Sequence, residues 1–143
     1  MWRPPISCLD ALQPVAALAA RLYVAYAFFL SGLTKLRDWD ITLALFTDEY
    51  KVPWLPPAWA AAMGTGGELV LPVLLALGLV GRFAALGLSV INVVAVISLG
   101  EIAPAALHQH WLWGALLVVI AVYGPERFSV DHWLVRRWRN PTA

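Results

Sequence analysis

Four long apolar stretches dominate the pattern of the chain. They cover about residues 12–33, 59–80, 83–99 and 106–123. A helix needs roughly 20 largely apolar residues to cross the hydrocarbon core of a bilayer, so the pattern predicts four transmembrane helices. Arg82 leaves room only for a tight turn between the second and third stretches, which must therefore be antiparallel neighbours. We expect an all-α, integral membrane four-helix bundle that forms a single domain over residues 1–143.

The polar stretches predict two further elements. The longest connection, residues 34–57, combines charges, tryptophans and prolines, and its part over 38–50 has apolar residues at 41, 45 and 46 with acids at both ends. This pattern predicts a short helix on the membrane surface. After the fourth stretch, Gly124-Pro125 ends the helix, and residues 126–140 predict an amphipathic tail helix whose arginines face an anionic leaflet.

Composition supports the membrane class and sets the orientation. The 143 residues are 61% hydrophobic and 13% charged, with a mean hydropathy of +0.72, values outside the usual range of soluble proteins. A formal charge of +1 without a basic stripe argues against nucleic-acid binding. Cys8 is the sole cysteine, so no internal disulfide or cysteine metal cluster can form.

Lys and Arg are more numerous beside the termini and Arg82 than in the loop over 34–57, so we expect both termini in the cytoplasm.

Three polar residues fall near the middle of predicted spans. Arg21, Glu68 and Asn92 belong to the first, second and third spans, and the helical rise of about 1.5 Å per residue places them at one level of the membrane. Pro72 lacks the N–H that would bond the carbonyl of Glu68, which weakens the helix there. In one interpretation Arg21 and Glu68 pair, and Asn92 completes their hydrogen bonds. In the other, the three bind the polar head of an apolar molecule such as a quinone or a lipid, with Glu68 exchanging a proton. We assign no catalytic residue.

His108 and His110 are weak candidates for metal ligands at the outer end of the fourth span. A copper or zinc site there would need a third ligand, such as Asp48, Glu49 or Met63. Two histidines at i and i+2 do not face the same way on a helix. We therefore interpret them as interfacial residues beside tryptophans and assign no metal.

Several local patterns, taken in order, resemble the DoxX family of small four-helix membrane proteins. They are Arg21 before Phe28-Phe-Leu-Ser-Gly-Leu-Thr-Lys-Leu36, Glu68 in mid-span, Leu77-Gly-Leu-Val-Gly-Arg-Phe-Ala-Ala-Leu86 and Gly124-Pro-Glu-Arg-Phe-Ser-Val-Asp131. The loop over residues 46–57 and the histidine before Trp111 most resemble the HvfX-type branch. The resemblance implies that recurrent polar residues of the family fall on Arg21, Lys35, Glu68, Arg82 and Asp131. Glu126 departs from the pattern, since many relatives have a glycine there.

The resemblance also implies several functions, which stay open at this point. The HvfX-type branch is associated with operons for secreted, modified metal-binding peptides, and the family takes its name from the membrane part of an archaeal thiosulfate:quinone oxidoreductase. We expect an accessory subunit of the bacterial inner membrane, rather than a stand-alone enzyme, that works with partner proteins in redox or metal homeostasis. The alternatives are a quinone-interacting membrane subunit of an oxidoreductase and a membrane receptor or chaperone for a secreted peptide. The sequence leaves the ligand, the reaction and a homo-oligomeric state open.

Overall fold

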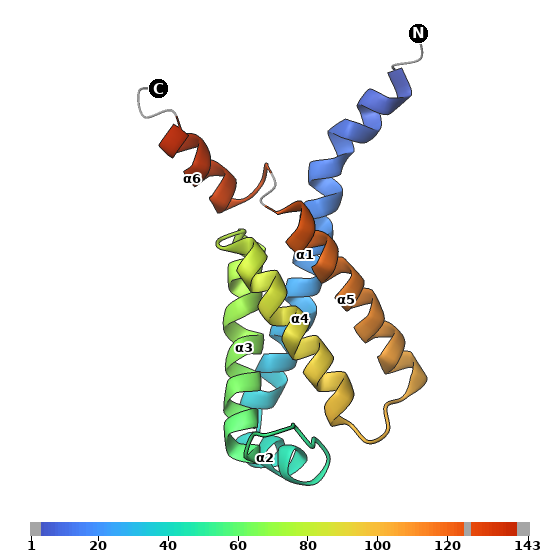
Figure 1. The fold of residues 1–143 in the computed structure, drawn as a ribbon, viewed down its shortest axis with the longest axis vertical. Coiled ribbons are helices and arrows are strands. Elements are labelled where there is room, and N and C mark those ends of the chain that lie inside the picture. Colours follow the sequence, from blue (N-terminus) through green and yellow to red (C-terminus); the bar gives the residue numbers. More distant parts are fainter. Residues whose placement is uncertain (1–3, 125–126, 140–143) are drawn as a thin grey trace.

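The computed structural model describes residues 4–124 and 127–139, which form six helices (Figure 1). They are α1 (Pro4–Arg37), α2 (Trp39–Asp48), α3 (Pro57–Leu77), α4 (Gly81–Ser98), α5 (Pro104–Tyr123) and α6 (Val130–Arg139). Within these described ranges the extended pairing is limited to one isolated bridge between Tyr50 and Leu99. Helices α1, α3, α4 and α5 are long and apolar enough to cross a membrane. The predicted all-α, four-helix membrane architecture is confirmed.

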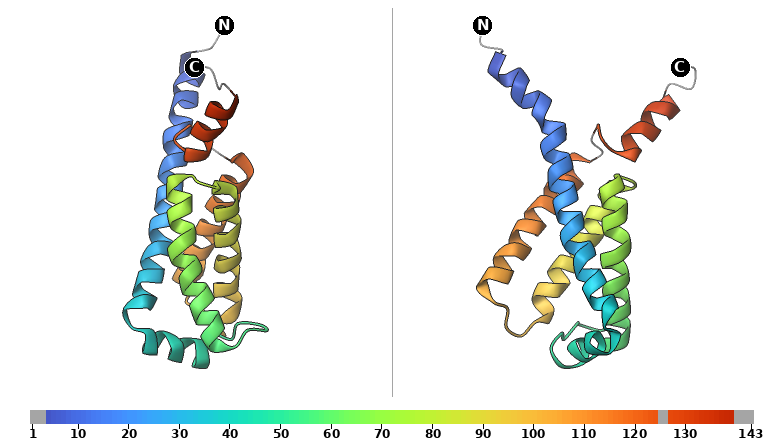
Figure 2. Two further views of the ribbon diagram at one scale, coloured as in Figure 1. Left: turned by 90° about the vertical axis from the view of Figure 1, so that its left-hand side faces the viewer. Right: turned by 180° about the vertical axis from the view of Figure 1, so that it is seen from behind.

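Helix α1 is much longer than its neighbours. It has 34 residues, or about 51 Å at the usual rise per residue, whereas α3 has 21 and α4 has 18. Its N-terminal end stands clear of the other helices, residues 13–20 lie beside the end of α5, and its second half packs mainly against α3 (Figures 1 and 2). The first span was expected over 12–33, and the helix that contains it extends beyond these bounds at both ends.

Helices α3 and α4 form an antiparallel hairpin. Gly78 ends α3 with a left-handed φ of 66°, a conformation that favours glycine, and Val80 follows with φ of 50°. The tail closes this turn, because the backbone N–H groups of Val80 and Gly81 donate to the Asp131 carboxylate at 2.9 Å each. The tight turn expected beside Arg82 is therefore present.

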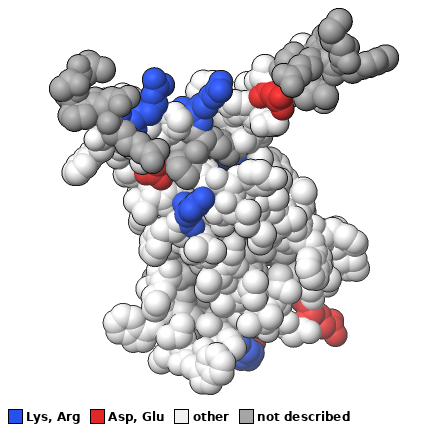
Figure 3. Space-filling model, turned by 45° about the horizontal axis from the view of Figure 1, so that its top comes forward, with Lys and Arg blue, Asp and Glu red and all other residues white. Residues whose placement is uncertain are grey.

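The shared core lies where α1, α3, α4 and α5 meet. It is built from buried apolar side chains, chiefly Val24, Phe28, Leu75, Leu88, Leu117 and Ile120. Most other large apolar side chains of these helices are exposed, which suits a bundle whose outer surface faces lipid. Charged side chains gather toward the two ends of the face in Figure 3, and the broad band between them is uncharged.

Helix α2 covers the end of the bundle opposite α6, which we call the outer end. Asp38 caps α2 by accepting from the N–H of Ile41 at 3.1 Å. Phe46 packs on Ala60 and Ala61 of α3, and the Thr42 hydroxyl donates to the carbonyl of Lys35 at the end of α1. The surface helix expected over 38–50 is thus formed, and it is fastened to the bundle by contacts of its own.

Candidate functional site

Glu68 is bound by Lys35. The carboxylate is buried on the inner face of α3, and its Oε2 lies 2.6 Å from the Nζ of Lys35. Lys35 also donates to the hydroxyl of Ser31 at 2.8 Å. Gly32 permits this pairing, since a Cβ there would lie only 3.1 Å from the backbone carbon of Glu68. Lys35 had been placed in the outer loop, but it belongs to α1, and its long side chain carries the charge back toward α3.

Arg21 lies at the other end of the bundle. Its guanidinium donates to the carbonyl of Phe128 at 2.6 Å and lies beside Gly78. Gly78 follows Glu68 by ten residues along α3, about 15 Å along the helix axis. The expectation that Arg21, Glu68 and Asn92 share one level is therefore wrong. The depth of Arg21 was counted from residue 12, whereas α1 begins at Pro4 and extends to Arg37.

Asn92 pairs with His110 across α4 and α5. The Asn92 side-chain amide donates to the backbone carbonyl of His110 at 2.9 Å, and its Oδ1 lies 2.7 Å from the ring Nδ1 of His110. Gly114 faces this pair, because a Cβ there would lie 3.2 Å from the Asn92 amide nitrogen. No local pattern in the sequence directly indicates this pairing. A glycine one turn after His110 on a helix facing Asn92 is the feature that indicates it in retrospect.

The two pairs belong to one group of side chains, which we call the outer polar cluster: Lys35, Glu68, Tyr50, Asn92 and His110. The charge of Lys35 acts on the His110 ring. At Tyr50, burial and then the negative charges of Glu68 and Glu49 raise the pKa above the usual tyrosine value. The hydroxyl of Thr65, one turn before Glu68, is buried and makes no hydrogen bond to the part of the chain described. A polar interior of this kind is costly in a membrane domain and is a typical mark of function.

A groove between α4 and α5 is lined by two residues of this cluster, Asn92 and His110. Its volume is about 680 Å³, and α4 and α5 diverge there toward the outer end (Figures 1 and 2). Its walls are almost entirely apolar, with Val93 and Ile97 on α4 and Val118 on α5, all exposed. Asn92 and His110 are the main polar groups in the wall. The groove therefore offers an apolar molecule a path from the lipid to a pair of hydrogen-bonding side chains.

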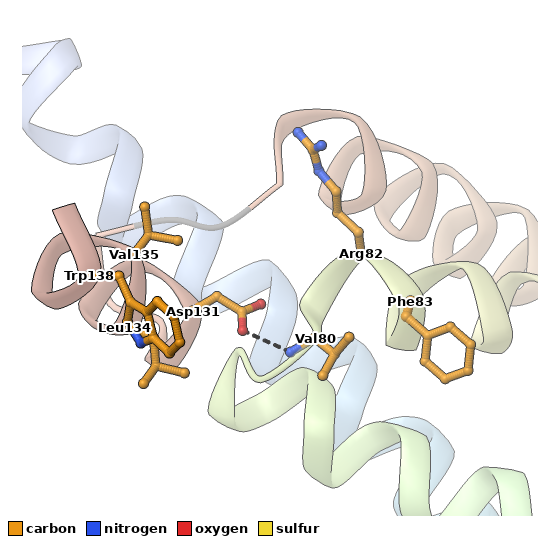
Figure 4. Close-up of a pocket in the computed structure, with 7 residues that line it drawn as sticks. All are labelled: Val80, Arg82, Phe83, Asp131, Leu134, Val135 and Trp138. Carbon is orange, nitrogen blue, oxygen red and sulfur yellow. Dashed lines mark hydrogen bonds between the residues drawn. The ribbon is translucent and has the colours of Figure 1, made fainter.

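A second hollow lies between α4 and α6, at the end of the bundle opposite α2, which we call the inner end (Figure 4). Asp131 is turned toward the N–H of Val80, whereas the side chain of Arg82 points away from α6 toward the end of α5, where it donates to the carbonyl of Val122 at 3.4 Å. Leu134 and Trp138 form the apolar wall on the α6 side. Asp131 thus ties the tail to the α3–α4 turn, and Arg82 ties the start of α4 to the end of α5.

The two histidines of α5 have different partners. His108 is exposed, and its Nδ1 lies 2.7 Å from the carbonyl of Pro104, whereas His110 is turned toward Asn92. Residues 4–124 and 127–139 contain no group of three or more His, Cys, Asp or Glu side chains able to hold a metal ion. The structure does not bring His108 and His110 together around one ion.

Comparison with known proteins gives the family. Residues 16–101, more than half of the chain, match the model of the DoxX family. An uncharacterized protein of Haemophilus influenzae (strain ATCC 51907 / DSM 11121 / KW20 / Rd) is 38% identical over an alignment of 128 residues, and the match covers 82% of each of the two chains. No solved structure matches. With four apolar helices that can cross a bilayer, this multi-pass membrane protein belongs to the DoxX family.

Proposed function

We propose that this protein is an accessory subunit of the bacterial inner membrane that works with partner proteins in redox or metal homeostasis, with both termini in the cytoplasm. Its own contribution is to bind an apolar molecule with a polar head, of the quinone type, in the α4–α5 groove. The resemblance of the loop over residues 46–57 to the HvfX-type branch suggests that the partners belong to a pathway for modified metal-binding peptides.

The groove is the observation that carries this proposal. Its volume of about 680 Å³ lies within the range of small-molecule sites, about 300–1,000 Å³, and such sites usually combine apolar walls with a few polar groups. Asn92 and His110 supply those groups here. Because the groove is open between exposed residues of two apolar helices, a ligand dissolved in the bilayer enters sideways without crossing water.

The remaining polar residues have distinct roles in the proposal. The ion pair of Glu68 and Lys35 fixes α1 against α3 and lies outside the groove wall. Glu68 is the carboxylate of the cluster that we propose exchanges a proton with the ligand. Arg21, bound to the tail carbonyl of Phe128, holds the inner end together and takes no part in binding. Of the three residues chosen from the sequence, Asn92 is thus kept as a binding residue, and His110 joins it.

The test is the small molecule that accompanies the protein. Purified gently from its own membrane, the protein should carry a quinone-type molecule at a near-stoichiometric level, detected by native mass spectrometry and by extraction. Val118→Phe fills the groove and should remove this molecule. Val122→Phe, a matched change one turn further along α5 on a more exposed residue outside the groove, should retain it. Wild-type protein without any such molecule, or equal amounts in both variants, would refute the proposal.

A receptor for a secreted peptide is the second candidate, and Trp54 supports it. This tryptophan in the outer loop is fully exposed and has a left-handed φ of 62°. Such a conformation costs about 1–2 kcal/mol for a residue with a Cβ and is often kept at functional sites. Trp54→Ser should abolish co-purification of a peptide partner, whereas Trp59→Ser on α3 should not. If the peptide is retained in Trp54→Ser, Trp54 is not its binding residue.

A further inference from the structure

We infer that the α4–α5 groove binds the reduced, hydroquinone form of its ligand in preference to the oxidised, quinone form. The inference rests on the proposed function for the groove as the binding site. It adds a preference for one of the two oxidation states of the ligand. The hydrogen-bonding groups in the groove wall determine this preference.

The first step is the orientation of the Asn92 amide. The backbone carbonyl of His110 can only accept a hydrogen bond, so the NH₂ group of Asn92 must face it across the 2.9 Å contact. The reversed amide would place two acceptor oxygens against each other. The side-chain oxygen of Asn92 is therefore the atom that lies 2.7 Å from the Nδ1 of His110.

The second step is the tautomer of His110. An amide oxygen only accepts, so Nδ1 of His110 must carry the hydrogen. The ring partner is a neutral amide, and Glu68, the acid of the outer polar cluster, is already bound by Lys35 at 2.6 Å. A half-buried imidazole in an apolar wall without a carboxylate partner is neutral. A neutral imidazole carries one N–H, so Nε2 is left with a lone pair and can only accept.

The third step is what an acceptor does to the two oxidation states. A quinone head offers carbonyl oxygens, which only accept and cannot bond Nε2. A hydroquinone head offers hydroxyl groups, which donate to it. Trp111 also lines the groove. Its N–H can donate equally to a carbonyl oxygen or to a hydroxyl oxygen, so it does not discriminate between the quinone and the hydroquinone. The Ser89 hydroxyl donates to the carbonyl of Ala85 at 2.8 Å, so toward a ligand its oxygen can only accept and favours the hydroquinone as well. Discrimination therefore depends on His110 together with Ser89, and Asn92 is the positioning residue for the His110 ring.

The tautomer can be measured without any ligand. In protein labelled with ¹⁵N-histidine in detergent micelles, the ring signals of His110 should show hydrogen on Nδ1 and a bare Nε2. Asn92→Leu removes the acceptor for Nδ1–H, so hydrogen on Nε2 should appear. The spectra of His108→Phe and His132→Phe identify the signals of the other two histidine rings. Hydrogen on Nε2, or on both nitrogens, in the wild-type protein would overturn the inference.

The preference itself can be measured with a benzoquinone that carries a short isoprenoid chain and with its hydroquinone, both under anaerobic conditions. Quenching of tryptophan fluorescence gives Kd for each form. We expect the hydroquinone to bind about tenfold more tightly, which is the effect of one net hydrogen bond. This preference would raise the two-electron midpoint potential of the bound couple by about 30 mV.

Matched variants separate the inference from the proposed function. His110→Phe keeps a ring in the wall but removes the Nε2 lone pair, so most of the preference for the hydroquinone should be lost, whereas His108→Phe should keep it. Equal binding of both forms to the wild-type protein, or a preference that is undiminished in His110→Phe, overturns the inference and leaves the groove as a quinone site. Binding of neither form overturns the proposed function and this inference together.

Discussion

Replacing Lys35 by methionine should leave the Glu68 carboxylate buried without its partner. The Glu68 side chain is 8% exposed and that of Lys35 is 20% exposed, with 2.6 Å between their charged atoms. At an effective dielectric constant of about 20, the attraction between such charges is about 6 kcal/mol, but transfer of each ion from water costs several kcal/mol. The intact pair therefore adds little net stability. Loss of one partner removes the attraction and retains the cost of burying the other.

We expect Lys35→Met to lower the free energy of unfolding by about 3 kcal/mol, at the lower end of the range for broken buried pairs because some water reaches Lys35. The double variant Lys35→Met with Glu68→Leu should lie within about 1 kcal/mol of the wild type, because replacing both ions with apolar groups removes both desolvation costs. Lys51→Met is the control. Lys51 is exposed and donates to the carbonyl of Thr47, so its replacement should change stability by less than about 0.5 kcal/mol.

The assay is reversible unfolding in mixed micelles of a mild detergent and dodecyl sulfate, followed by the helical circular dichroism signal. If Lys35→Met unfolds like the wild type, Glu68 is not held as a charged partner. If the double variant is no more stable than the single one, the cost does not come from an unpaired carboxylate. Either result would refute the physical account of the pair.

Three further predictions concern other parts of the fold. The raised pKa of Tyr50 means that the folded protein keeps a proton that the unfolded chain loses, so stability should fall as pH rises above about 10; Tyr50→Phe should reduce this fall in alkaline melting curves, and an unchanged slope would contradict the assignment. Asp131→Ala should cost about 1–2 kcal/mol by removing the cap of α4, with faster hydrogen exchange confined to the first turn of α4 as the expected signature. Gly78→Ala should destabilise by at least about 1 kcal/mol, because φ is 66° and the new Cβ would lie 2.5 Å from that of Ser129; Gly66→Ala, with open space around it, is the control and should be neutral or stabilising.

Hydropathy alone predicted three of the spanning helices closely, because their ends are marked by prolines, glycines and charges. The expected spans over 59–80, 83–99 and 106–123 correspond to α3, α4 and α5 with shifts of a few residues. The helix that contains the first span continues to Lys35 and Arg37, which were counted as loop. Lys35 continues the helix because Glu68 neutralises its charge inside the bundle, and a hydropathy window does not contain that partner.

The candidate site was predicted in part. Glu68 and Asn92 are buried as expected, but their partners come from helix faces that no local pattern specifies. Glu68 meets Lys35 because α1 passes closely at Gly32. Arg21 binds a backbone carbonyl, and a carbonyl carries no signature in the sequence. His110 was considered as a metal ligand because residue type suggested it, whereas its position on α5 makes it the partner of Asn92.

The cap of α4 has a consequence for the order in which the protein is made. Asp131 follows the two amides that it binds by 51 and 50 residues. At synthesis rates of about 5–20 residues per second, those amides wait for about 3–10 seconds after leaving the ribosome. In that time α5 must cross the bilayer in the direction opposite to α4, because only then does the carboxylate emerge on the same side as the α3–α4 turn. In a chain in which α5 fails to insert, Asp131 is on the opposite side of the membrane from the α3–α4 turn. The cap of α4 can therefore form only in chains with the correct topology.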